Sequence, residues 1–184
     1  MFSKDLCLLE DIDNLIEAGI DSFKIEGRMK TAFYVATVIR AYRQAIDAYY
    51  EGNFSKEISD KYVNEIKKAS HRHFTKGFLY GKPDSEAQIY ESSSYIRNYD
   101  FIGVILDYDK DSKIATVEQR NRFFLNDEVE IFGNSKDFFE FKIDNIKNLK
   151  GEDIEVANKP KEKLLIKIDL PLEPGDMIRK AIED

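Results

Sequence analysis

Several residue types that carry recognisable chemistry are scarce in this chain of 184 residues. It contains one cysteine, two histidines and no tryptophan. The single cysteine, Cys7, excludes an internal disulfide and suits a reducing compartment. No apolar run approaches the roughly 18 to 20 residues that a membrane span needs, and acidic residues interrupt the first fifteen positions. We therefore expect neither a membrane helix nor a signal peptide, and a cytoplasmic location.

Common catalytic signatures are also missing from the sequence. There is no G-x-G-x-x-G, no Walker loop, no Gly-x-Ser-x-Gly elbow and no Cys-x-x-Cys. Cys7 lies among leucines, which is the setting of a buried apolar filler, and a catalytic thiol would need a histidine nearby. The residue pattern alone therefore assigns no enzyme class.

Negative charge is concentrated in the second half of the chain. Residues 1–83 hold 13 Lys/Arg against 12 Asp/Glu, whereas residues 84–184 hold 15 against 23. Nucleic-acid affinity rests largely on Lys and Arg, so we expect the second half to be a poor RNA-binding surface and the first half to offer a local basic patch at most.

The first half has helical periodicity. Apolar residues recur at helical spacing over residues 8–18, and a longer stripe runs from Ala32 to Tyr49 with Thr31 as its N-cap and Gly52 as its end. A third helix is predicted over residues 56–69. Between the first two helices, IDSFKIEG at residues 20–27 is typical of a short strand.

From Tyr90 onward the apolar period changes to alternation. Residues 101–108 and 113–120 predict a hairpin, and turn-like separators divide the strands predicted after it: 128–133, 138–146, 153–158, 163–169 and 176–181. The sequence thus predicts an α+β fold, in which a helical segment over residues 1–83 precedes a small antiparallel β-barrel over residues 84–184, with the boundary at Lys82-Pro83-Asp84.

Five phenylalanines are expected in the core of the strand domain, although an exposed base-stacking platform is the alternative. They are Phe123, Phe124, Phe138, Phe139 and Phe141.

The stretch FKIEGRMK supplies the first candidate site. Glu26 and Arg28 stand at the predicted strand end, where a carboxylate and a guanidinium can do catalysis or bind substrate, and Lys24 and Lys30 flank them as candidate substrate-binding residues. The structural alternative is an ion pair between Glu26 and Arg28 that closes the loop.

The stretch SHRHFTKG supplies the second candidate site. It contains both histidines, His71 and His73, together with Arg72 and Lys76. A substrate or RNA-phosphate contact is one interpretation, and a general acid or a His-x-His metal pair are others. The structural alternative is a helix C-terminus, where basic side chains favour the helix dipole.

Four separated blocks resemble the C-terminal part of the collagenase-like peptidases, the thirty-second family among peptidases of unknown catalytic type. They are SKDLCLLE (3–10), IEAGIDSFKIEGRMK (16–30), YVATVIRAYRQAIDAY (34–49) and SHRHFTKGFLYGKP (70–83). The strand-rich remainder resembles the β-barrel C-terminal domain of bacterial members.

The resemblance implies that this chain is the end of a longer protein. An α/β barrel that holds an iron–sulfur cluster would precede residue 1, residues 1–83 would complete that barrel, and FKIEGRMK would be one of its late strands. Cys7 would then be the last cluster ligand in the full-length protein, whereas the fragment itself holds no cofactor.

The resemblance also implies two activities for the full-length protein. The family name implies proteolysis, and other members are implicated in oxygen-independent hydroxylation. We favour hydroxylation of a tRNA uridine at C5, with this part as an accessory or substrate-placing module. A collagenase-like protease and a non-catalytic binding or assembly domain are the alternatives. The implied partners are tRNA and the upstream barrel domain, and we expect the isolated fragment to be inactive and to self-associate.

Overall fold

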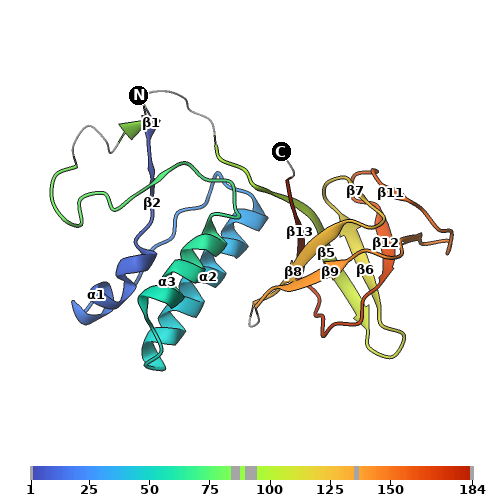
Figure 1. Cartoon of the computed structure of the whole chain (residues 1–184), viewed down its shortest axis with the longest axis horizontal. Helices are drawn as coiled ribbons and strands as arrows, with labels where there is room; N and C mark the ends of the chain where they lie inside the picture. The colour runs from blue at the N-terminus through green and yellow to red at the C-terminus, as the bar shows by residue number, and fades with distance from the viewer. Residues whose placement is uncertain (1, 84–87, 90–94, 135–136, 183–184) are drawn as a thin grey trace. The chain divides into compact units, whose positions relative to one another are not determined.

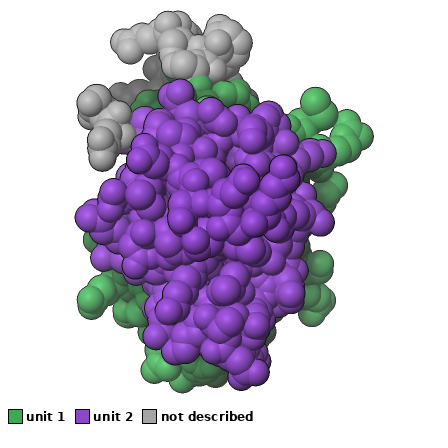
Figure 2. All heavy atoms as spheres, turned by 90° about the vertical axis from the view of Figure 1, so that its right-hand side faces the viewer, with its two compact units in different colours: residues 1–98 green, residues 99–184 purple. Residues whose placement is uncertain are grey.

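Helices fill the first part of the chain and strands the second, in a computed structural model that describes residues 2–83, 88–89, 95–134 and 137–182. The chain divides into unit 1, residues 1–98, and unit 2, residues 99–184 (Figures 1 and 2). The predicted α+β class is confirmed. The composition change at Lys82 and Pro83 precedes the unit boundary, and Asp84 lies outside the described residues. Within the described ranges, no helix is both long and apolar enough to cross a membrane.

The described part of unit 1 contains three α-helices that begin and end close to the predicted positions. A 3-10 turn, η1 (Leu9–Asp11), leads into α1 (Ile12–Glu17), followed by α2 (Ala32–Tyr50) and α3 (Lys56–Ile66). The predicted N-cap is confirmed, because the Thr31 side chain accepts a hydrogen bond from the Tyr34 backbone nitrogen at 3.2 Å.

Apolar faces of these helices form the core of unit 1. A buried ion pair adds to it, since Arg40 Nη1 on α2 lies 3.1 Å from Glu65 Oε2 on α3. The buried cluster comprises Cys7, Leu9, Ile12, Val38, Ala41, Ala45, Val63 and Ile66.

The predicted strand over residues 20–27 is wrong. This segment is irregular, and the short strands of unit 1 lie elsewhere (Figure 1). β2 (Asp5–Leu6) pairs in parallel with β3 (Phe74–Thr75), and β1 (Phe2–Ser3) pairs antiparallel with β4 (Gln88–Ile89). A strand needs a neighbour to bond its backbone groups. Within the described part of unit 1, β2 pairs with β3, and segment 20–27 takes part in no strand pairing.

Unit 2 is a seven-stranded antiparallel sheet that curls into a half-barrel (Figure 1), which confirms the antiparallel prediction. The order is β10-β12-β6-β5-β13-β8-β9, and a separate two-stranded ladder joins β11 to β7. The strands are β5 (Tyr99–Asp109), β6 (Ile114–Gln119), β7 (Phe123–Phe124), β8 (Glu128–Phe132), β9 (Phe139–Lys142), β10 (Lys147–Asn148), β11 (Val156–Ala157), β12 (Lys163–Lys167) and β13 (Met177–Ala181).

Buried apolar side chains from the strands and loops of unit 2 form its core. Phe123 is 1% exposed within this core, as predicted, whereas the prediction for Phe124 is wrong because it is 39% exposed. The two residues alternate along a short strand, so one side chain faces the core and the next faces away. Phe141 packs against the core from its edge and remains half-buried.

Candidate functional site

A hollow of about 470 Å³ in unit 1 gathers several polar side chains that lie far apart in the sequence. Segment 20–26 forms one wall, and β2, α1 and α2 form the others. The floor is largely leucine and isoleucine. Seven polar or ionisable side chains line it: Asp5, Ser22, Lys24, Glu26, Lys30, Tyr34 and Tyr42.

Lys30 places its ammonium group in this hollow. A backbone hydrogen bond of 2.9 Å from Lys30 N to Gly27 O closes the turn that precedes it. The Nζ atom lies over two rings, 4.7 Å from the Tyr34 centroid and 4.3 Å from the Tyr95 centroid. It is buried, and it has no hydrogen-bond partner among the described residues. A buried ammonium in this state favours a ligand that offers an acceptor atom.

Asp5 is the carboxylate nearest to Lys30, but Arg72 already engages it. The Lys30 Nζ to Asp5 Oδ2 distance is 3.9 Å, which is too long for a hydrogen bond. Arg72 donates to Asp5 from Nε at 3.1 Å, from Nη2 at 2.9 Å and from its backbone nitrogen at 3.0 Å. Two cations therefore share one carboxylate, which leaves Lys30 able to bind a further anionic or carbonyl oxygen.

Two tyrosines add hydroxyl groups to the walls. Burial, with Asp5 as the second cause, raises the pKa of Tyr34, and burial, with the Cys7 thiol as the second cause, raises the pKa of Tyr42. Both hydroxyls therefore stay protonated at neutral pH. Tyr42 is held in place, because its oxygen accepts a hydrogen bond from Leu8 N at 3.0 Å.

Glu26 and Arg28 do not form the ion pair that was the structural alternative. Instead, Glu26 Oε1 accepts a 2.9 Å hydrogen bond from the backbone nitrogen of Arg28. Glu26 lines the hollow, and Arg28 is exposed and does not. Gly27 between them is required by space, since a Cβ there would lie 2.8 Å from Cγ2 of Val35. The hollow thus brings Lys24, Glu26 and Lys30 together, and their catalytic or substrate-binding roles stay predictions.

The basic side chains of SHRHFTKG are divided among different contacts. His71 is 5% exposed and stacks on Phe74, and its Nδ1 lies 2.9 Å from the Ala69 carbonyl. Burial lowers the pKa of His71, so it is neutral near pH 7. Lys76 lies 2.6 Å from Glu10 and 2.6 Å from Asp11. His73 is exposed, and only Arg72 of this set reaches the hollow, through Asp5.

Lys76 and Asp11 form an ion pair in which each side chain stabilises the charge of the other. Burial opposes both charges, but the hydrogen bonds from Lys76 and Tyr80 outweigh it and lower the pKa of Asp11. For Lys76, burial is likewise outweighed by the hydrogen bonds to Asp11 and Glu10, which raise the pKa of the amine. Lys76 therefore supports the fold of η1.

Sequence reasoning missed Asp5, Tyr34, Tyr42 and Tyr95 as members of the site. Asp5 and Arg72 are 67 positions apart in the sequence, so no local sequence pattern predicts their ion pair. Tyr42 belongs to the apolar stripe predicted for α2, and no sequence pattern singled out Tyr34.

Cys7 is the only cysteine of the chain, and the residues of this chain alone do not supply the ligands of an iron–sulfur cluster. Cys7 is 6% exposed, and its sulfur accepts a hydrogen bond from the Tyr42 hydroxyl at 3.9 Å. A cluster requires about four ligands, usually cysteines. No group of three or more His, Cys, Asp or Glu residues suited to a metal occurs within the described ranges.

Two family models match the chain in succession. Peptidase family U32 matches residues 1–89, and the Peptidase family U32 C-terminal domain matches residues 97–179. The tRNA hydroxylation protein P1 of Bacillus subtilis (strain 168) is 39% identical over 181 residues, which are 98% of this chain and 43% of that protein. The tRNA hydroxylation protein P of Escherichia coli (strain K12) is 30% identical over 161 residues, which are 85% of this chain and 34% of that protein.

Relatives that are not named as tRNA hydroxylation proteins also match. A collagenase of Porphyromonas gingivalis is 27% identical over 179 residues, which are 97% of this chain and 49% of that protein. Among solved structures, the C-terminal domain of a U32 family protein of Geobacillus thermoleovorans is 40% identical; it covers 44% of this chain and 99% of its own, with a TM-score of 0.43. The chain spans less than half the length of these full-length relatives. It belongs to peptidase family U32.

Proposed function

We propose that this chain serves in the hydroxylation of a tRNA uridine at C5, within a longer protein of the family. The observation that carries the proposal is the 39% identity to the Bacillus subtilis tRNA hydroxylation protein P1 over 98% of this chain. The Porphyromonas gingivalis collagenase is 27% identical over a similar span, so the comparison favours hydroxylation over proteolysis.

The hollow of unit 1 supplies binding and positioning in this proposal. Hydroxylation replaces a C5–H bond by a C5–O bond and removes two electrons from the ring, so an oxygen donor must accept two electrons. The buried, unbonded Lys30 ammonium would hold an acceptor oxygen of a reactant, and Lys24 and Glu26 would orient it from the rim. Arg72 acts indirectly, because it fixes Asp5 beside Lys30.

Mass spectrometry of bulk tRNA tests the proposed reaction. We expect deletion of the gene to abolish 5-hydroxyuridine and its derivatives, and the intact gene to restore them. A deletion strain with unchanged levels of these nucleosides, in which no second copy of the gene is present, would refute the proposal.

Proteolysis is the rival activity, since collagenases occur among the relatives. Incubation of the homogeneous full-length protein with gelatin, with and without chelator and thiol inhibitors, separates the two. Cleavage that persists in pure protein and disappears on substitution of a residue of the hollow would support the rival.

The apolar surface around the hollow is the basis for the proposed partners. Leu6, Ile20, Ile25 and Met29 are 64%, 42%, 36% and 89% exposed. Exposed apolar surface of this kind marks an interaction site. We propose that the upstream barrel domain covers it in the longer protein, that the same domain supplies any further cluster ligands beside Cys7, and that the protein acts in the cytoplasm on tRNA.

A further inference from the structure

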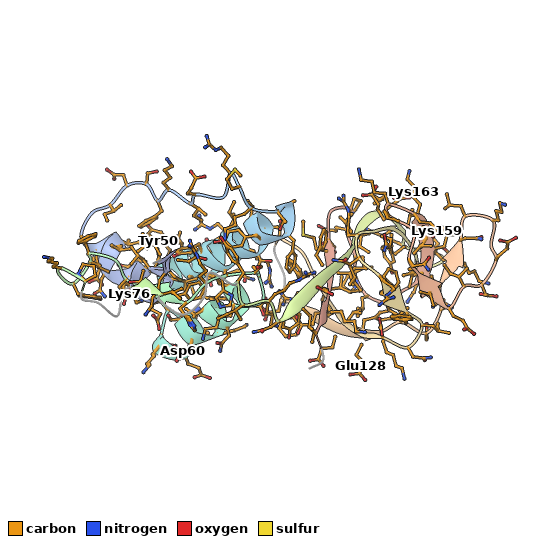
Figure 3. The ribbon with its side chains drawn as sticks, turned by 90° about the horizontal axis from the view of Figure 1, so that it is seen from above. Tyr50, Asp60, Lys76, Glu128, Lys159 and Lys163 are labelled. Carbon is orange, nitrogen blue, oxygen red and sulfur yellow. The ribbon has the colours of Figure 1, made fainter. Side chains whose placement is uncertain are left out.

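Unit 2 carries local groups of acidic and of basic side chains, although its acidic residues are in excess. A hollow of about 400 Å³ beside β8 and β9 is lined by Glu128, Glu130 and Glu140, with Lys142 as its one lysine. In Figure 3, Glu128 lies at one side of unit 2 and Lys163 at the opposite side. The net charge of the unit therefore does not describe the surface near β12.

Strand β12 presents lysines on its outer face. Leu164 and Ile166 are 0% and 1% exposed in the core, so the alternate residues, Lys163, Leu165 and Lys167, face outward. Leu165 pairs with Lys147 on β10 and with Thr116 on β6. We call the outer surface formed by Lys147, Lys163, Leu165 and Lys167 the lysine face.

Acidic neighbours leave part of this positive charge uncompensated. Glu118 pairs with Lys163 in the β6–β12 register, but Arg120 engages its carboxylate at 2.7 Å. Lys147 lies 2.7 Å from Asp153. Neither Lys163 nor Lys167 has an ion pair within 4.0 Å among the residues that the structure describes. The lysine face therefore keeps two cations free to bind an anionic partner.

A groove of about 520 Å³ adjoins the lysine face. Leu165, Ile114 and Phe141 give it an apolar wall, and Lys147 and Lys167 also line it. Of its two carboxylates, Asp169 is bound by Lys113, and Asp144 accepts a hydrogen bond from the neutral amide of Asn145 and keeps its charge. Lys167, which has no ion pair among the described residues, thus lies beside a wall that contains an aromatic ring. Positive charge next to an aromatic side chain is typical of surfaces that bind single-stranded nucleic acid.

We propose that the lysine face binds the phosphate backbone of the tRNA substrate, with a base resting against Leu165 and Phe141. Lys163 and Lys167 are four residues apart on one strand, which corresponds to about 13 Å. A polymer with repeating phosphates can contact both lysines at once, whereas one small anion cannot. The identity of the RNA in this inference rests on the proposed function. The inference places an RNA-binding surface on unit 2, although the acidic composition of the unit disfavours nucleic-acid binding.

Fluorescence anisotropy with a labelled tRNA transcript tests this assignment on the 184-residue chain. The test variant is Lys163→Ala with Lys167→Ala. The matched control is Lys110→Ala with Lys142→Ala, two exposed lysines of the same unit that lie outside the lysine face. Thermal melts by circular dichroism check that each variant is folded.

The expected change follows from counterion release. Each lost phosphate contact lowers the slope of log K against log salt by about 0.7 to 0.9, so two contacts correspond to roughly a 15- to 30-fold weaker affinity at 0.15 M salt. We expect this loss for the lysine-face variant and less than a twofold change for the control. Equal losses in both variants, or no binding of tRNA by the wild-type chain, would overturn the inference.

A competition experiment separates RNA from a protein partner. Unlabelled tRNA should displace the labelled transcript, and gelatin should not; displacement by gelatin alone would overturn the inference. The proposed reaction is judged separately, by tRNA nucleosides in the deletion strain. Loss of binding in the double variant together with unchanged nucleosides in that strain would support the lysine face and refute the hydroxylation.

Discussion

Arg179 is a fully buried charge of unit 2 that contacts a carboxylate and aromatic rings. Its side chain is 0% exposed, and Nε donates to Glu130 Oε2 at 2.6 Å. The guanidinium carbon lies 4.6 Å from the Phe132 ring centroid and 5.5 Å from that of Tyr99. Replacement of Arg179 by methionine keeps most of the side-chain volume and removes every one of these interactions.

The expected loss of stability is large compared with the stability of the unit. Removal of one partner of a buried ion pair costs about 3 to 5 kcal/mol, because the other charge stays desolvated. Glu130 would be that charge, with its side chain 14% exposed. A unit of about 86 residues has an unfolding free energy of about 4 to 13 kcal/mol. Arg179→Met should therefore remove a large fraction of it.

Urea unfolding of the whole chain, followed by circular dichroism and tyrosine fluorescence, measures the loss. Lys180→Met is the matched control, because Lys180 is next on β13, is 26% exposed, and lies 2.7 Å from Asp127. We expect the control to cost less than about 1 kcal/mol. A loss below about 1 kcal/mol for Arg179→Met, or one equal to the control, would refute the reasoning.

Three further predictions concern unit 1. Acidification should destabilise it, because burial lowers the pKa of His71: the unfolded chain takes up the proton near its ordinary pKa of about 6.5, so stability is lost as the pH falls from there toward the lowered pKa of the folded state. The pH dependence of urea unfolding should be flatter in His71→Asn than in the control His73→Asn; identical curves would contradict this. Gly27→Ala should cost about 1 to 3 kcal/mol, because the added Cβ would lie 2.8 Å from Val35 Cγ2, and less in a Val35→Ala background; equal costs in the two backgrounds would count against the clash. The chain should self-associate through its exposed apolar residues, and Leu6→Lys with Met29→Lys should weaken this in sedimentation velocity; a wild-type chain that stays monomeric at high concentration would exclude it.

The helices and most strands could be predicted because their signals are local. The Thr31 cap and Gly52 mark the ends of α2 within one stretch, and most strands of unit 2 alternate over a few residues between turn signals. The face that α2 buries was not predicted, because Ile39 of the predicted stripe is 48% exposed, whereas Val38 and Ala41 are buried. Segment 20–27 has the composition of a strand, but a strand forms only where another segment lies beside it and bonds to its backbone groups. A single sequence does not show that β2 pairs with β3 instead.

The candidate site was predicted only in part, for the same reason. FKIEGRMK pointed to Lys24, Glu26, Arg28 and Lys30, and all of these except Arg28 line the hollow. Their roles stay predictions. Asp5 and Tyr95 reach Lys30 from distant parts of unit 1, which the sequence does not signal. His71 and Lys76 looked functional by residue type, but burial and ion pairing commit them to the fold.

Charge totals do not describe the local surface of unit 2 near β12. The excess of acidic residues predicted a poor surface for RNA. Alternation along β12, however, places Lys163 and Lys167 on one face, away from the glutamates of β8 and β9. The sign of a local surface depends on strand order and register, which composition does not contain.

The abundance of 5-hydroxyuridine derivatives in tRNA from cells that express the full-length Lys30→Met protein tests the central claim most directly. Lys61→Met, on the exposed side of α3, is the control at equal protein level. If Lys30 binds a reactant in the hollow, the modified nucleosides should fall at least tenfold in Lys30→Met and remain at the wild-type level in Lys61→Met. Wild-type levels in a folded Lys30→Met protein would contradict the account.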